Sequence, residues 1–216
     1  MIVFTIVFGN LAKIDSNGVP YAIFSFTALV PWTYFSGALS SSSGSLLSSS
    51  GMMTKVYFPR LIIPMSPVIS KLIDFFIALI LLAGMMLYFG FTPSTDIIYL
   101  PFLILIMMFT ASGLGMWFTA LAIQYRDINY GMGFFIQLLM YAAPVVYPAS
   151  NVPDTYRTLY GVFPMAGVIE GFRAILLQTI KIPWDLISTG TIVSIILFLT
   201  GALYFRRMEK YFADVA

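Results

Sequence analysis

The sequence predicts an all-α integral membrane protein with about six hydrophobic helices. Hydrophobic residues make up 60% of its 216 residues and charged residues only 9%, whereas a soluble domain of this length needs far more polar residues to cover its surface. Several apolar runs also reach the roughly 20 residues that cross a bilayer core of about 30 Å as a helix. The formal net charge of +2 is spread thinly along the chain, so no nucleic-acid partner is expected.

Five runs are long and apolar enough to span the membrane within a single domain that covers residues 1–216. The opening run of residues 1–12 makes only about half a span, so we expect a partial first span with a truncated N-terminus; the alternative is the outer half of a broken first span. The five complete spans are predicted at residues 21–43, 62–89, 97–123, 130–146 and 186–205.

The positions of Lys and Arg predict the orientation, because cytoplasmic loops carry an excess of these residues. Lys55 and Arg60, then Arg126, and finally the basic tail at residues 206–216 fall on the same side of the predicted spans. Both termini of this multi-pass chain are therefore expected in the cytoplasm.

The long segment at residues 147–183 is predicted to lie on the outer side and to re-enter the membrane. It begins with proline and turn-forming residues, and residues 165–180 then follow an amphipathic helical pattern. Such a helix is tolerated at membrane depth only if it packs against protein or lines a wet cavity.

Two pairs of opposite charges are spaced three residues apart, which places each pair on one face of a helix. Lys71 and Asp74 lie within a predicted span, and Glu170 and Arg173 lie in the outer segment. Both are interpreted as structural ion pairs. For Lys71 and Asp74 the alternative is a coupling pair for protons or ions in a secondary transporter.

Residues 36–51 contain nine serines, and Gly37, Gly44 and Gly51 follow one another at intervals of seven. Seven residues are nearly two helical turns, so the glycines would share one face. This face is expected either to let another helix approach closely or to line a polar conduit.

Aromatic residues near the expected outer boundary are typical of interface anchors, and their rings could also stack on sugars. This group comprises Trp32, Tyr34, Tyr147, Tyr156 and Tyr160.

The chain has no Cys and no His, which excludes disulfides, thiolate or imidazole metal sites and His-based catalysis. It also has no P-loop for nucleotide phosphates. We therefore expect no metal or cofactor on this chain, no enzymatic activity of its own, and an energy source on another protein.

Six short sequences, in this order, resemble those of type-2 ABC exporter permeases, which move polysaccharide, lipopolysaccharide O-antigen, capsule or teichoic acid. They are PWTYFSGAL at 31–39, TKVYFPRLIIP at 54–64, YRDI at 125–128, APVVYP at 143–148, PMAGVIEGFR at 164–173 and FRRMEKYFAD at 205–214. The resemblance implies a homodimer of six-helix permeases in the bacterial cytoplasmic (inner) membrane, surrounded by lipid. It also implies two copies of a cytoplasmic ABC ATPase subunit that carries the ATP and Mg. Family members have an amphipathic helix and a complete first span before the stretch that begins here with Met1.

The resemblance also implies roles for particular residues. The cytoplasmic segment at 51–61 would hold a coupling helix that docks on the ATPase through Lys55, Val56, Tyr57, Phe58 and Arg60, with Arg126 and Asp127 as a second contact. The substrate, a glycan or lipid-linked glycan, is expected along a path that includes Trp32, Tyr34, Ser41, Ser45, Tyr147 and Tyr156. The alternatives are a secondary transporter and a membrane scaffold without transport.

Overall fold

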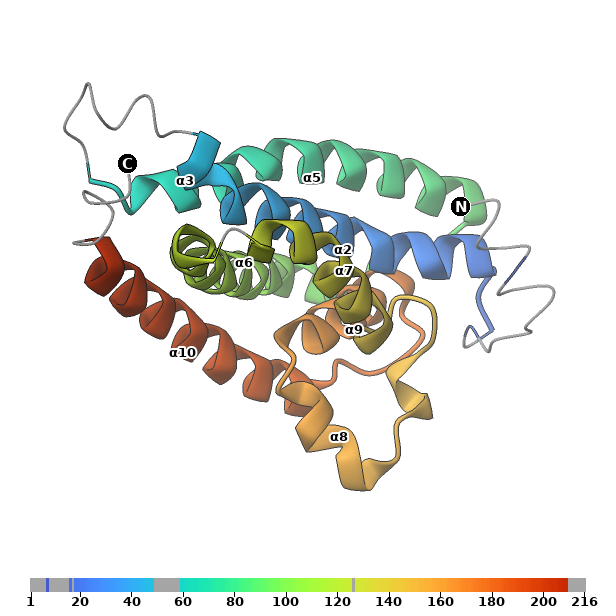
Figure 1. Ribbon diagram of the computed structural model, residues 1–216. Coiled ribbons are helices and arrows are strands. Elements are labelled where there is room, and N and C mark those ends of the chain that lie inside the picture. Colours follow the sequence, from blue (N-terminus) through green and yellow to red (C-terminus); the bar gives the residue numbers. More distant parts are fainter. Residues whose placement is uncertain (1–6, 8–15, 17, 49–58, 126, 210–216) are drawn as a thin grey trace.

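Every regular element that the structure describes is a helix (Figure 1). The structure is a computed structural model that describes residues 7, 16, 18–48, 59–125 and 127–209. Four stretches are long and apolar enough to cross a membrane: α2 (Tyr21–Ser43), α5 (Ile62–Phe89), the stretch Thr95–Gln124 and α10 (Trp184–Met208). The stretch Thr95–Gln124 combines the 3-10 helix η2 (Thr95–Tyr99) with α6 (Leu100–Gln124). The predicted all-α membrane class is therefore confirmed.

Shorter helices connect the long ones. They are α3 (Ser45–Ser48), α7 (Asp127–Ala142), the 3-10 helix η3 (Ala149–Asn151), α8 (Asp154–Gly161) and α9 (Pro164–Leu177). The count of six spanning helices stays a prediction, since residues 1–6 and 8–15 lie outside the described residues.

Helix α7 is shorter than the span predicted at residues 130–146. Its 16 residues cover about 24 Å at 1.5 Å per residue, which is less than the thickness of a bilayer core. The helix ends before Pro144, because a proline disfavours helical geometry in the residue that precedes it. The apolar residues at 143–146 instead form a buried turn.

Helix α6 occupies the centre of the bundle, where it contacts α2, α5, α9 and α10. Glycines set its closest approach: a Cβ added to Gly201 of α10 would lie 2.5 Å from the carbonyl oxygen of Gly113 in α6. A Cβ added to Gly115 of α6 would likewise meet the Ser42 side chain of α2. Small residues therefore let α6 and α10 pack backbone against backbone and let α2 approach α6 through the Ser42 side chain.

The glycines that the sequence analysis singled out do not have this packing role. A Cβ on Gly37 would meet only the Lys71 side chain, at 3.7 Å, and a Cβ on Gly44 would meet nothing within 4 Å. Gly51 lies outside the described residues. Within the described residues no helix of this chain packs closely on Gly37 or Gly44, because the tight contacts of α2 form on its other side, at Ser42. Close approach by another helix, or a polar conduit, stays a prediction for this face.

Helices α8 and α9 meet at an angle of 101°. All residues of α9 from Pro164 to Leu177 are buried, and the helix packs against α2, α6 and α10 (Figure 1). Protein therefore surrounds α9 on every side, which is the environment that a bent, membrane-inserted segment requires.

Helix α5 has the opposite character. Most of its exposed residues are large and apolar, including Ile73, Ile80 and Leu87, whose exposed fractions are 67%, 71% and 81%. Such a surface suits contact with hydrocarbon.

Candidate coupling surface and translocation path

Arg60 joins two parts of the chain that are far apart in sequence. Its Nη1 donates a hydrogen bond to the carbonyl oxygen of Glu209 at 3.1 Å, and its Nε lies 3.9 Å from Oε1 of the same residue. The beginning of α5 is thereby tied to the end of α10 (Figure 1, left). Under this link, Ile63 packs in an apolar cluster with Phe205 and Met208.

Of the other predicted coupling residues, the structure describes only Asp127. Lys55, Val56, Tyr57, Phe58 and Arg126 lie outside the described residues, so their roles stay predictions. Asp127 is exposed in the first turn of α7, where an acidic side chain complements the helix dipole. Sequence reasoning did not find Glu209, because nothing local relates it to Arg60 across 149 positions.

Arg173 is the most deeply buried charge that the structure describes. Its Nη1 lies 2.9 Å from Oε1 of Glu170 and also donates to the carbonyl oxygen of Tyr147, while its Nη2 donates to the carbonyl oxygen of Val145 at 2.9 Å. Its guanidinium carbon lies 3.6 Å from the ring centroid of Phe24. Both side chains of the ion pair are at most 2% exposed, so protein groups supply their hydrogen bonds, although Nε of Arg173 has no partner among the described residues.

Glu170 completes this arrangement by accepting a hydrogen bond from the backbone N–H of Ala149 at 2.9 Å. Tyr21 of α2 donates its hydroxyl to the carbonyl oxygen of Val146 at 2.9 Å. The predicted pair thus forms, and it clamps the turn at residues 143–149 between α2 and α9. This turn connects α7 to α8, so the clamp fixes where the bent α8–α9 segment begins.

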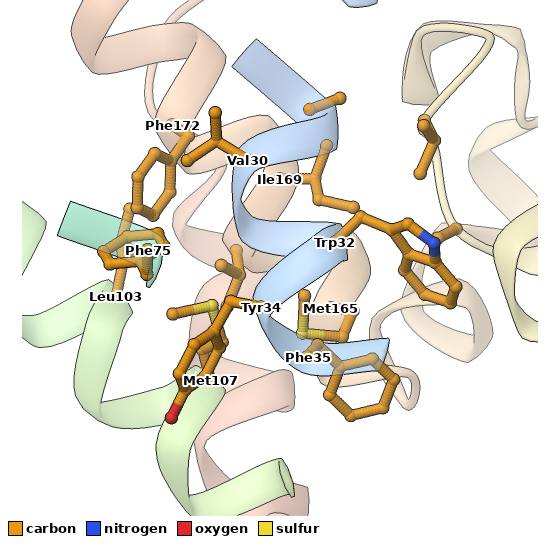
Figure 2. Close-up of a cluster of buried hydrophobic side chains, with 14 of the residues drawn as sticks. Val30, Trp32, Tyr34, Phe35, Phe75, Leu103, Met107, Met165, Ile169 and Phe172 are labelled. Atoms are coloured by element: carbon orange, nitrogen blue, oxygen red, sulfur yellow. The ribbon is translucent and has the colours of Figure 1, made fainter. Parts of the chain in front are cut away.

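Trp32 and Tyr34 are buried in the middle of α2 instead of lying at a membrane boundary. Their exposed fractions are 4% and 3%, and both belong to the main apolar core (Figure 2). The hydroxyl of Tyr34 donates to the carbonyl oxygen of Val68 at 2.9 Å, and its ring meets Phe75 edge to face. The expected belt position is wrong for these two residues, because protein covers this side of α2. Their contact with substrate stays a prediction.

The remaining residues of the predicted substrate path fall in different environments. Ser41 is exposed, but Ser45 is buried and donates its hydroxyl to the carbonyl oxygen of Ser42. Tyr147 is half-buried, and its hydroxyl contacts that of Tyr160 at 3.2 Å. Tyr156 is 60% exposed on α8. These side chains do not converge on a single site within the described residues.

From Thr33 onward the uncovered face of α2 carries only small residues, most of them with hydroxyl groups, whereas the earlier turns leave Phe26 and Leu29 partly exposed. Within α2 it consists of the exposed or partly exposed residues Thr33, Ser36, Gly37, Ser40 and Ser41, and it continues past the end of the helix with Gly44 and with Ser48 of α3. We call this face the α2 hydroxyl stripe. It contrasts with the exposed face of α5, which is made of large apolar side chains.

An intramembrane ion pair borders the α2 hydroxyl stripe. The Nζ atom of Lys71 lies 2.8 Å from Oδ2 of Asp74, and both side chains are exposed. The stem of Lys71 passes beside Gly37. Charges and hydroxyl groups therefore meet on the same part of the bundle surface.

Helix α7, which packs against α2, adds exposed aromatic rings. Tyr130, Phe134 and Tyr141 follow at helical spacing with exposed fractions of 88%, 68% and 65%, and Gln137 lies between them on the same face. Sequence reasoning treated this helix only as a span. The helical spacing of Tyr130, Phe134 and Tyr141 was the available signal.

Metal binding finds no support among the described residues, where no group of three or more acidic side chains could hold an ion.

Comparisons with known proteins agree with this geometry. The family model described as ABC-2 type transporter matches residues 1–177. The O-antigen export system permease protein RfbA of Klebsiella pneumoniae is 24% identical over 196 residues, which cover 90% of this chain and 75% of that protein. The protein of the same name from Myxococcus xanthus is 24% identical over 216 residues, which cover 99% of this chain and 82% of the relative. The chain therefore belongs to the ABC-2 type transporter family.

Proposed function

We propose that this chain is the membrane-spanning permease of an ATP-binding cassette exporter that moves a lipid-linked polysaccharide across the bacterial cytoplasmic membrane. Two relatives that align with nearly the whole chain are named O-antigen export permeases, which supports a polysaccharide substrate. The energy comes from a separate ATPase subunit, since the sequence has no P-loop. Two permease copies and two ATPase copies make up the exporter.

The observation that carries this proposal is the α2 hydroxyl stripe beside the Lys71–Asp74 pair. Thr33 and Ser36 already donate their hydroxyls to carbonyl oxygens of α2, but hydrocarbon gives no hydrogen bonds to the exposed lysine and aspartate, so this surface is unfavourable against lipid tails. A wet path for a polar polymer satisfies all of these groups. The exposed rings of α7 supply faces on which sugars can stack.

The coupling mechanism follows from the contacts of Arg60. ATP binding draws the two ATPase subunits together and displaces the segment at residues 51–61. The bond from Arg60 to Glu209 passes this movement to the end of α10. Helix α10 packs along α6 and contacts α8 and α9, so both ends of the bundle respond to one displacement.

The first experiment measures whether water reaches the α2 hydroxyl stripe or the apolar face of α5 in the assembled exporter. Because the chain has no native cysteine, single-cysteine variants can be labelled without background. Ser40→Cys and Ser41→Cys should react with a membrane-impermeant thiol reagent in the assembled exporter, since only a hydrated thiol ionises. Ile80→Cys and Leu81→Cys are the matched controls, because they are equally accessible on the apolar face of α5. Equal labelling of both pairs would contradict a wet path along α2.

The second experiment tests the partner. The chain should co-purify with an ATPase subunit in mild detergent, and the Tyr57→Ala/Arg60→Ala variant should lose it. Arg157→Ala is the control, since Arg157 lies on α8 and binds Asp185 of α10, far from Arg60. Retention of the ATPase by the double variant would refute the proposed docking segment.

The alternative function, secondary transport, can be tested at the Lys71–Asp74 pair. If protons or ions drove transport through this pair, Lys71→Gln/Asp74→Asn would abolish export. We expect export to persist in this variant and to stop when ATP hydrolysis by the partner is blocked.

A further inference from the structure

A cavity of about 530 Å³, lined by polar and apolar side chains alike, lies at the end of the bundle where α9 finishes. It opens between η2, the last turn of α9 and the first turn of α10, away from the α2 hydroxyl stripe. Its main lining residues are Ser94, Asp96, Tyr99, Gln178, Lys181 and Trp184.

The walls of this cavity are held by hydrogen bonds between segments distant in sequence. The backbone N–H of Ser94 donates to the carbonyl oxygen of Ile175 at 2.9 Å, and the Gln178 side chain donates to the carbonyl oxygen of Thr92 at 2.8 Å. Gln178 itself has a φ of 54°, the one positive φ among the described non-glycine residues. This left-handed geometry is uncommon for a glutamine, and it ends α9 so that the next residues turn across the mouth of the cavity.

The cavity presents one positive and one negative side chain that are not paired with each other. Asp96 accepts a hydrogen bond from the Ser94 hydroxyl at 2.9 Å, but no described cation lies within ion-pair distance of its carboxylate. Lys181 is exposed and likewise has no ion pair with a described residue. The two groups complement a ligand that carries both an anion and a cation.

The surroundings of the cavity are those of a membrane interface. The rings of Tyr99 and Trp184 meet edge to face at 5.1 Å at its rim, and they are 40% and 48% exposed. The exposed surface continues along η2 and α6 with Ile98, Phe102 and Leu105. Amphipathic rings above an apolar surface mark the level at which lipid headgroups lie.

From these observations we infer that the cavity binds the headgroup of an aminophospholipid, with Lys181 on the phosphate, Asp96 on the ammonium group and the acyl chains along α6. A lipid fits better than a glycan, because apolar surface continues directly from the polar lining. The inference rests on the membrane location of the chain and does not depend on the exported substrate, so the two proposals can fail separately.

The test compares lipids on the purified full-length chain. Native mass spectrometry would count bound phosphatidylethanolamine, phosphatidylcholine and phosphatidylglycerol after delipidation and stepwise addition. The wild-type chain should retain phosphatidylethanolamine about tenfold better than the other two, since charge-assisted hydrogen bonds to both groups form only with this headgroup. Equal retention of all three lipids would overturn the inference.

Two substitutions have different expected signatures. Lys181→Gln should lower retention of phosphatidylethanolamine and phosphatidylglycerol alike, because both carry the phosphate. Asp96→Asn should remove the preference for phosphatidylethanolamine over phosphatidylglycerol and leave phosphate binding. Arg207→Gln is the matched control for the loss of one cation, since Arg207 is exposed near the other end of α10. An equal loss of lipid in Arg207→Gln would refute a site at the cavity.

A competition experiment distinguishes a lipid headgroup from a free phosphate ester as the ligand of the cavity. Soluble phosphoethanolamine should displace the lipid only at far higher concentration, because it lacks the acyl chains that contact α6. Displacement at equal concentration would point to a free phosphate ester and contradict lipid binding. Displacement by a neutral oligosaccharide would instead assign the cavity to a glycan.

Discussion

Replacing Arg173 with methionine should destabilise the fold severely. Methionine keeps much of the side-chain volume, but it removes the positive charge beside Glu170, whose side chain is only 2% exposed. Loss of one partner from a buried ion pair typically costs about 3–5 kcal/mol, because the remaining charge has no compensation. The hydrogen bonds to the carbonyl oxygens of Val145 and Tyr147 are lost as well.

The two halves of the pair should not contribute equally. In Glu170→Gln the amide oxygen can still accept the N–H of Ala149, and Arg173 keeps both carbonyl partners. We therefore expect a smaller loss than in Arg173→Met. The double variant should be more stable than the sum of the single losses predicts, by about 1–3 kcal/mol, since neither charge is left alone.

Reversible unfolding in mixed micelles gives the free energy of unfolding for each variant. Lys71→Met is the control, because Lys71 belongs to an exposed ion pair of the same spacing and exposed pairs contribute about 0–1 kcal/mol. The reasoning fails if Arg173→Met lies within about 0.5 kcal/mol of the wild-type chain, or if the two substitutions are strictly additive.

Three further predictions follow from close contacts and hydrogen bonds. Gly201→Ala should cost about 1–3 kcal/mol, because its Cβ would meet the backbone of α6, whereas Gly84→Ala, with no atom within 4 Å, should be neutral or slightly stabilising by thermal unfolding. Arg60→Glu should lower the export per ATP hydrolysed, and adding Glu209→Arg should restore part of it; no recovery would exclude the side-chain link. Tyr34→Phe should cost about 0.5–1 kcal/mol by losing its hydrogen bond to α5, with export retained, and abolished export would contradict a supporting role in the core.

The positions of most spans could be predicted because length and hydropathy are local properties. The predicted spans at residues 21–43 and 62–89 have the bounds of α2 and α5, and that at 186–205 lies within α10. The span at 130–146 was wrong at its end, although Pro144 was a readable signal.

Contacts across the bundle could not be predicted in the same way. The spacing of Glu170 and Arg173 predicts their pairing, but not the carbonyl groups of the turn at residues 143–149 that surround them. Likewise, a glycine permits close approach without specifying which helix approaches. This is why Gly201 on α10 has that role and Gly37 does not.

Helix α10 connects the two ends of the bundle. Its 25 residues span about 37 Å. At one end Glu209 binds Arg60, and at the other Asp185 binds Arg157 of α8 at 2.5 Å. Between them, contact with the α6 backbone at Gly201 prevents independent sliding. Gly167 of α9 approaches α10 almost as closely, since an added Cβ would lie 2.8 Å from the carbonyl oxygen of Leu186. If ATP binding displaces Arg60 as proposed, α6, α9 and α10 are therefore expected to move as one unit.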